Sequence, residues 1–188
     1  VTIADIAQKA ELSKGAIYLY FSSKEEIYAQ ILLDDIGKVH SKVVPIFDGT
    51  SRASEILREF AHLYVDYFMK DRGMFRLLMD FMMHADNLNL SNVTNQRIIQ
   101  ETNKAISVTE SVFQYGIDTG EFVLGKEDVR DMRNALWGML NGAISLHLFI
   151  GHESTRAERI HKNVDDCLKL FIEGLSASGG QASVEYTQ

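Results

Sequence analysis

The sequence has little of the residues that interrupt helices or cross-link chains. Its 188 residues include one proline and one cysteine. Because Cys167 has no possible partner within the chain, no internal disulfide can form, and nothing indicates an oxidising compartment. Between these residues lie long stretches rich in Leu, Ile, Met, Ala, Glu, Lys and Arg, which lose little on entering a helix. The sequence therefore predicts an all-α fold.

Several signals of other protein classes are also missing. No apolar run approaches the roughly 20 residues that span a bilayer, and no secretory signal opens the chain. There is no Gly-rich phosphate loop or nucleophile elbow, and the six histidines are scattered. Asp80 and His84 stand four residues apart without a third metal ligand nearby. We therefore expect a cytoplasmic protein that is not an enzyme and has no cofactor, metal or membrane anchor.

The formal net charge of -7 alone argues against nucleic-acid binding. Non-specific DNA affinity comes from Lys and Arg that displace counterions from phosphates. Residues 1–45, however, hold five Lys and six acidic residues, whereas residues 46–188 hold 14 basic and 20 acidic residues. Because most of the acidity lies outside the first 45 residues, DNA binding by that segment remains open.

Two short helices are predicted at the start of the chain. Thr2 is a suitable cap for the first, with Asp5 at its positive end, and Ser13 caps a second over Lys14 to about Tyr20. Two such helices separated by about three residues form a helix-turn-helix. Its expected packing residues are Ile6, Ala7, Leu12, Ile17 and Phe21.

A longer helix is expected next. Ser23 is its predicted cap, and Glu26 is expected to complete a capping box with it. Pro45 disfavours helical backbone at Val44 and ends the helix there. Amphipathic spacing predicts five further helices, at about 52–70, 71–85, 91–116, 127–150 and 155–175. Turn residues separate them, at 71–73, 86–89, 118–120 and 151–154.

The stretch from Thr2 to Ile27 resembles the DNA-binding signature of the TetR family. Its most specific part is Ser-Lys-Gly-Ala-Ile-Tyr-Leu-Tyr-Phe at residues 13–21, followed by Ser-Lys-Glu-Glu at 23–26. The chain departs from the family at Glu11, where a glycine is usual and the backbone often needs a left-handed conformation. A helix that precedes the motif in the family is also absent before Val1, so the chain is expected to be a fragment.

The resemblance implies a bacterial, ligand-responsive transcriptional regulator. It is expected to be a homodimeric repressor that a small hydrophobic molecule releases from a palindromic operator. Residues 1–45 would form an incomplete helix-turn-helix domain with its connecting helix, residues 46–176 the ligand-binding and dimerisation domain, and residues 177–188 a flexible tail.

Eight residues are candidates for DNA contact: Thr2, Ser13, Lys14, Gly15, Ala16, Tyr18, Tyr20 and Lys24. The two small ones let the helix backbone approach the major groove, and the hydroxyls and amines can donate to phosphates or base edges. The resemblance assigns Lys24 to a phosphate at the start of its helix, with Thr2 in a similar role. In the alternative interpretation the tyrosines only pack and Lys24 is a solvated charge.

A ligand site is expected between the middle helices. Its candidate lining is aromatic and rich in methionine, which suits varied hydrophobic ligands: Tyr64, Phe68, Phe75, Met79, Met82, Met83, Phe113, Trp137 and Asn141. The alternative is that these side chains are simply core. The last two helices correspond to those that pair between subunits in the family, and Gly138 and Gly142 lie one turn apart, which allows close helix approach. These glycines could instead face the ligand cavity or a helix of the same chain.

Two rival functions remain at this point. One is a helical small-molecule-binding protein or enzyme whose opening helices only resemble a DNA reader. The other is a DNA-associated scaffold that dimerises but takes no ligand.

Overall fold

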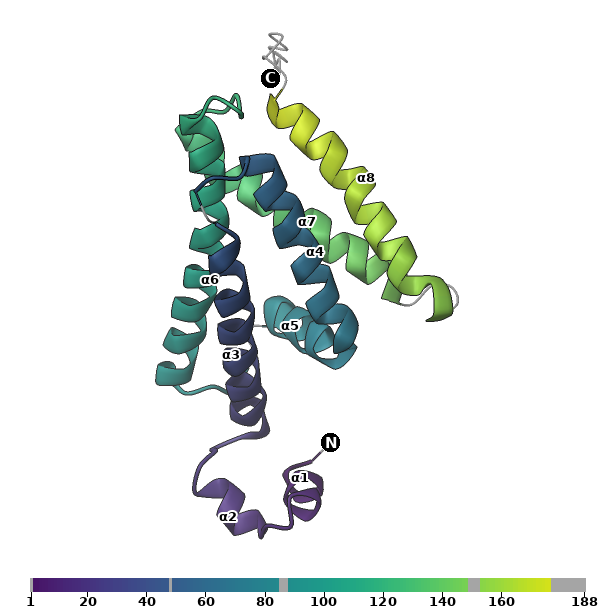
Figure 1. Cartoon of the computed structure of the whole chain (residues 1–188). Helices are drawn as coiled ribbons and strands as arrows, with labels where there is room; N and C mark the ends of the chain where they lie inside the picture. Colours follow the sequence, from purple (N-terminus) through teal and green to yellow (C-terminus); the bar gives the residue numbers. More distant parts are fainter. Residues whose placement is uncertain (1, 48, 85–87, 149–152, 177–188) are drawn as a thin grey trace, which may run out of the picture. The chain divides into compact units, whose positions relative to one another are not determined.

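The computed structural model describes residues 2–47, 49–84, 88–148 and 153–176, and every regular element among them is a helix (Figure 1). Its α-helices are α1 Ile3–Lys9, α2 Lys14–Tyr18, α3 Lys24–Val43, α4 Ala53–Lys70, α5 Arg72–His84, α6 Asn92–Asp118, α7 Val129–Leu148 and α8 Arg156–Ser176. Short 3-10 turns are η1 Val44–Ile46, η3 Lys126–Asp128 and η4 Glu153–Thr155. This confirms the all-α prediction. The turns expected at 86–87 and 151–152 and the tail 177–188 lie outside the described residues.

The chain divides into two compact units. The first unit consists of Val1–Ser41 and Asp71–Ala105, and the second of Lys42–Lys70 and Ile106–Gln188. The expected division at residue 45 does not coincide with these units. The reason lies in the packing of α3, whose buried Ala29 and Leu32 contact Phe81 of α5, with Ile98 of α6 packed against the same cluster.

The helix-turn-helix of the first unit has the predicted caps. The backbone N–H of Asp5 donates to Thr2 Oγ1 (3.2 Å), and the Thr2 N–H donates to the Asp5 carboxylate (2.8 Å), which closes a capping box around α1. Ser13 Oγ accepts from the Ala16 N–H at the start of α2 (3.1 Å). Each cap satisfies an amide that has no partner inside its own helix.

The core of the helix-turn-helix is small and differs from the prediction at two residues, since Ile6 is only half-buried outside the cluster and Leu12 is exposed. Ile3, Ala7 and Ile17 are buried together, with Phe21 and Ile27 packed against them. Leu12, predicted to fill the angle between the helices, is 52% exposed. The prediction for Leu12 is wrong, because the core is formed by Ile3, Ala7 and Ile17 with Phe21 and Ile27, without Leu12.

The turn between α1 and α2 contains a left-handed residue. Glu11 has φ 56°, the one positive φ at a non-glycine position among the described residues. The N–H of Leu12 donates to the Ala7 carbonyl across this turn (2.9 Å), which ends α1. The expectation of a left-handed backbone at this position is therefore confirmed, and Glu11 adopts it without the freedom that glycine has.

In the second unit α8 packs against α4 and α7, and α4 also contacts α7. The residues that α8 contributes to this core are Ile160, Val164, Leu168, Ile172 and Leu175. Most of the apolar stripe of α8 is thus used within its own chain. Two His–Asp pairs cross between α4 and α8: His62 with Asp165 (2.6 Å) and His161 with Asp66 (2.8 Å).

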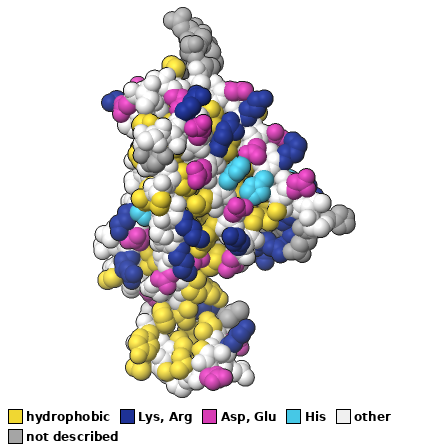
Figure 2. Space-filling model, in the orientation of Figure 1, with side chains coloured by type: hydrophobic (Ala, Val, Ile, Leu, Met, Phe, Trp, Pro, Cys, Tyr) yellow, Lys and Arg dark blue, Asp and Glu magenta, His cyan; other side chains and the backbone are white. Residues whose placement is uncertain are grey.

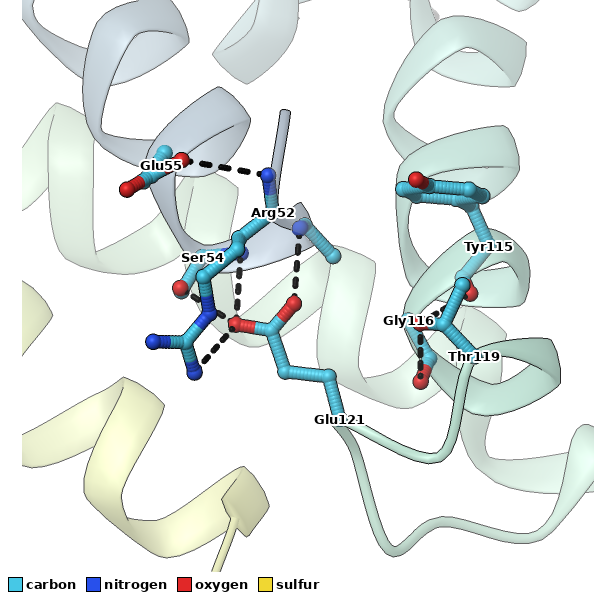
Figure 3. A network of polar contacts seen from close by, with 8 residues as sticks. Arg52, Ser54, Glu55, Tyr115, Gly116, Thr119 and Glu121 are labelled. Carbon is cyan, nitrogen blue, oxygen red and sulfur yellow. Dashed lines mark hydrogen bonds and ion pairs between the residues drawn. The ribbon is translucent and has the colours of Figure 1, made fainter. Parts of the chain in front are cut away.

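The turn after α6 places a carboxylate at the start of α4 (Figure 3). Glu121 accepts from the backbone N–H of Ala53 (2.8 Å) and of Ser54 (3.3 Å), from the Ser54 hydroxyl, and from the Arg52 guanidinium (3.3 Å). Burial raises the pKa of Glu121, but these donors outweigh it and the pKa lies below its ordinary value. A negative charge at the positive end of α4 stabilises the helix.

Glycine makes this turn possible at two positions. Gly120 has φ 73°, which a side chain would strain. The Phe122 ring lies directly on Gly116, where an added Cβ would collide with the Phe122 Cδ2 atom. The turn predicted at 118–120 is present, and it fixes the backbone that presents Glu121.

The left-handed turn leads to a test of local stability. Replacing Glu11 with glycine removes a side-chain penalty but adds backbone entropy to the unfolded chain, for a net gain of about 0.5–1 kcal/mol. Glu11→Gly should therefore slow amide hydrogen exchange across α1 and α2 about two- to fivefold. Glu11→Ala keeps the penalty and should show no gain. Equal protection in both variants would mean that φ 56° carries no strain.

Candidate nucleic-acid interface and effector site

The predicted DNA contacts lie in the first unit and mostly at its surface. Thr2, Ser13, Lys14, Gly15, Tyr18 and Tyr20 are exposed, whereas Ala16 and Lys24 are half-buried. Tyr18 and Tyr20 are 49% and 82% exposed, so neither is a core residue. The alternative that these tyrosines only pack is therefore not supported by their surroundings.

Two lysines of this surface lie over tyrosine rings. Lys14 Nζ is 5.7 Å from the ring centre of Tyr18 on α2, and Lys24 Nζ is 5.7 Å from that of Tyr28 on α3. A cation over an aromatic face is held by a weak attraction. Each ammonium keeps donors for a phosphate, and each ring restricts where that ammonium lies.

The two capping hydroxyls, of Thr2 and Ser13, can still donate a hydrogen bond to a ligand. The oxygens of Thr2 and Ser13 accept backbone N–H groups at the starts of α1 and α2. A hydroxyl that accepts such a bond keeps its own O–H as a donor. These side chains are thus fixed in place with one donor each for a phosphate oxygen.

The start of α3 is held to the start of α6 by Glu26. Ser23 Oγ accepts from the Glu26 N–H (3.1 Å), so the predicted Ser23 cap is confirmed. The Glu26 carboxylate does not return to Ser23. It accepts instead from the Ser91 N–H and from the Thr94 hydroxyl, both at 2.5 Å. The part of the predicted capping box that Glu26 was expected to form is therefore wrong. The Glu26 carboxylate instead completes a cap at the start of α6, where Ser91 lies 65 residues further along the chain.

The same junction has two further polar contacts. Ser23 also donates its hydroxyl to the Asn89 carbonyl (2.9 Å), and Arg97 donates to Gln30 (3.4 Å). Lys24, between these anchors, therefore stands on a helix end whose position is fixed by hydrogen bonds on both sides.

Four of the predicted ligand residues meet in the second unit. The Tyr64 hydroxyl donates to Asn141 Oδ1 (2.7 Å), and Trp137 meets the Tyr64 ring edge-on with ring centres 4.9 Å apart. Phe68 packs against Tyr64 in the same way, at 4.8 Å. Burial raises the pKa of Tyr64, which keeps its hydroxyl protonated as a donor. The Trp137 Nε1 atom is buried and has no hydrogen-bond partner within the described structure.

The other five predicted ligand residues lie apart from this group. Phe113 is fully buried between Phe122 and Phe171, with ring centres 6.2 Å from each. The remaining four are on α5 in the first unit: Phe75, Met79, Met82 and Met83. Phe75 is buried, but Met82 and Met83 are 62% and 71% exposed. These two do not have the interior position expected of them, because both fall in the last turn of α5, beyond its buried residues.

One cavity of about 280 Å³ is described in the second unit. Its lining is polar and contains none of the predicted ligand residues: Thr50, Ser51, Arg52, Tyr115, Thr119, Gly120 and Glu121. Asp80 and His84 form an exposed pair on α5 (3.1 Å), and no group of three potential metal ligands occurs among the described residues. Within that part of the chain, no helix is long and apolar enough to traverse a bilayer.

Sequence reasoning missed two residues at these sites. Leu19, between two candidate tyrosines, is 82% exposed. The run of three large side chains at residues 18–20 was the available signal. The role of Glu26 as an anchor had no local signal, since its partners are distant in sequence.

Comparison with known proteins decides the family. Residues 1–31 match the model of the bacterial regulatory proteins of the tetR family, and residues 54–177 match that of the C-terminal region of QacR-like proteins. The chain belongs to the TetR family. It is accordingly a transcriptional regulator with a DNA-binding helix-turn-helix and a C-terminal ligand-binding region, rather than an enzyme.

Individual relatives of this TetR-family chain are distant. The fatty acid metabolism regulator protein of Bacillus subtilis is 22% identical over 76% of the chain and 71% of its own length. QacR of Staphylococcus aureus, an HTH-type transcriptional regulator, is 23% identical over 93% of the chain and 87% of its own length.

Solved structures share the fold. PfmR, a TetR family transcriptional regulator from Thermus thermophilus, aligns with a TM-score of 0.72 at 24% identity, over 93% of this chain and 89% of that one. FadR of Bacillus subtilis, solved in complex with stearoyl-CoA, aligns with a TM-score of 0.71 at 19% identity, over 93% and 88%.

The Glu26 anchor predicts how the first unit responds to acid. Burial raises the pKa of Glu26, but the hydrogen bonds from Ser91 and Thr94 outweigh this effect and lower it below 4.5. A carboxyl group whose pKa is lower in the folded than in the unfolded state stabilises the fold at pH values above its unfolded pKa. That stabilisation is lost as the pH falls through the folded pKa. Glu26→Gln should therefore be less stable than the wild type at pH 7, with a difference that shrinks toward pH 3. Urea unfolding across this range measures the difference, and a constant gap would contradict the anchor.

Proposed function

We propose that this chain is a repressor that binds a palindromic operator as a homodimer and leaves it when a hydrophobic ligand binds. The observation that carries the DNA part is the surface of α2 and the start of α3. There, the Ser13 hydroxyl, two lysines and two exposed tyrosines lie on a helix-turn-helix of the TetR type, and Thr2 adds a second capping hydroxyl at the start of α1. Hydroxyls and amines of this kind position a recognition helix on phosphates, while its small residues approach the bases.

An open face of α7 supports dimerisation. Ala135, Gly138, Gly142 and Leu146 are all exposed and follow one another at helical spacing. Nothing lies within 4 Å of a Cβ added at either glycine, so no helix of the described chain uses their close approach. On α8, Leu170 is 70% exposed, and Gly174 is likewise open. The proposed dimer would cover these faces with the same faces of a second copy.

The polar atoms around Trp137 support a ligand class. Tyr64 holds the Asn141 oxygen, which leaves the Asn141 NH₂ group to donate, and the buried Trp137 Nε1–H lacks an acceptor within the described residues. The two donors are one turn apart on α7; the Phe60 ring packs on Trp137, and the Phe68 ring packs on Tyr64. A molecule with a carbonyl oxygen and a long apolar body satisfies both. Since FadR was solved with stearoyl-CoA, we propose a long-chain fatty acyl thioester.

Lys24→Ala tests the DNA part. Removing one phosphate contact lowers the slope of log affinity against log salt by about 0.9. A dimer with two Lys24 side chains on one operator should thus show a slope smaller by about 1.8, with weaker binding to every sequence. The measurement is a filter-binding titration at several salt concentrations. Lys162→Ala, at an exposed lysine of α8, is the matched control and should leave the slope unchanged.

The outcomes of that titration separate the parts of the proposal. A slope change near 0.9 would indicate one subunit on each duplex and contradict the dimer. An unchanged slope would contradict the phosphate role of Lys24. A wild-type protein without measurable affinity for any duplex at low salt would contradict DNA binding altogether.

Trp137→Phe tests the ligand class. It removes the Nε1–H donor but keeps an aromatic ring, and a hydrogen bond worth about 1 kcal/mol corresponds to about fivefold in affinity. Calorimetric titration with stearoyl-CoA should show this loss, with free CoA as the control ligand. Trp137 is the only tryptophan, so wild-type fluorescence reports binding independently. Unchanged affinity in the variant would exclude Nε1 as a ligand contact, and no binding by the wild type would exclude stearoyl-CoA.

A further inference from the structure

Among the large hydrophobic side chains described in the first unit, two of the most exposed stand at the end of α2. Leu19 is 82% exposed, between Tyr18 at 49% and Tyr20 at 82%. Figure 2 shows hydrophobic side chains gathered over the α2 part of the surface. A lone exposed leucine needs no explanation, but three large side chains in a row form a patch of the kind that marks a binding surface.

Leu19 shares an open face of α2 with Gly15. The Leu19 N–H donates to the Gly15 carbonyl (3.2 Å), so the two residues stand one turn apart. A Cβ on Gly15 would meet only Ser13 Oγ, at 3.8 Å. Ile17 is turned into the core, and Lys14 with Tyr18 forms the neighbouring ridge. On the Gly15–Leu19 face of α2, a base edge can thus approach the helix backbone with the least obstruction, because Gly15 has no side chain. The same base edge would meet the apolar side chain of Leu19.

We propose that Leu19 recognises thymine by packing against its C5-methyl group in the major groove. This inference rests on the proposed DNA binding and adds a specificity residue to it. Thymine is the only base of unmodified DNA that presents a methyl group in that groove, and an apolar contact is the only favourable one a leucine offers there. The lysine and tyrosine donors beside Leu19 are suited to phosphates, which carry no sequence information.

The test removes single methyl groups from a preferred duplex. The protein is used to select tight-binding duplexes from a random pool, and each thymine of the selected sequence is then replaced in turn by deoxyuridine. One thymine in each half-site should be sensitive, with binding weakened about fourfold, the effect of one methyl-sized apolar group. The replaced base keeps all of its hydrogen-bonding atoms, so only the apolar contact changes.

Two variants assign the sensitivity to Leu19. Leu19→Ala should bind the thymine and deoxyuridine duplexes equally, whereas Leu19→Met, which keeps a long apolar side chain, should restore the difference. Val93→Ala, at a 68% exposed position on α6, is the matched control and should behave like the wild type. Equal binding of both duplexes by the wild type, or an undiminished difference in Leu19→Ala, would overturn the inference while leaving DNA binding intact. Failure to select any duplex would contradict the proposed function itself.

Discussion

The capping of helix starts by distant carboxylates organises both compact units. The first amides of a helix have no partner within it, and the aligned peptide dipoles make that end positive. In the first unit Glu26 of α3 accepts from the Ser91 N–H at the start of α6. In the second, Glu121 accepts from the Ala53 and Ser54 amides at the start of α4. Each bond joins segments more than 60 residues apart and fixes where a long helix begins.

These anchors bear on function because α6 belongs to both units. Its first turn is held by Glu26, and further along it Glu110 pairs with Arg133 of α7 at 2.6 Å. Trp137 and Asn141 follow Arg133 on the same helix at intervals of one turn. Helix α6 thus connects the first unit covalently to the part of the chain that contacts α7, where we propose that the ligand binds.

The DNA-binding surface is built on a very small core. Ile3, Ala7 and Ile17 hold α1 and α2 together, with Phe21 and Ile27 closing one side. A core of this size leaves the large side chains at 18–20 at the surface, where they are available for the proposed recognition of DNA. The strained Glu11 turn sets the path of the chain from one helix to the other.

Local features of this protein were determined by the sequence alone. The α-helices of the described residues follow from apolar spacing and caps, both of which act within a few residues. The same holds for the Thr2 cap, the left-handed backbone at Glu11 and the family signature at residues 13–26. Each depends on neighbours in the chain, so a single sequence is enough to predict it.

Only the tertiary structure decided which of these groups meet. Glu26 was expected to bond beside Ser23, but the amide of Ser91 is a partner that no local pattern predicts. Leu12 is exposed because other residues fill the core, and Met82 and Met83 are exposed because they follow the buried part of α5. Among nine ligand candidates, the structure brought Tyr64, Phe68, Trp137 and Asn141 together. Helical periodicity shows that a side chain is apolar and faces inward, but the packing of separate helices determines which neighbour it contacts.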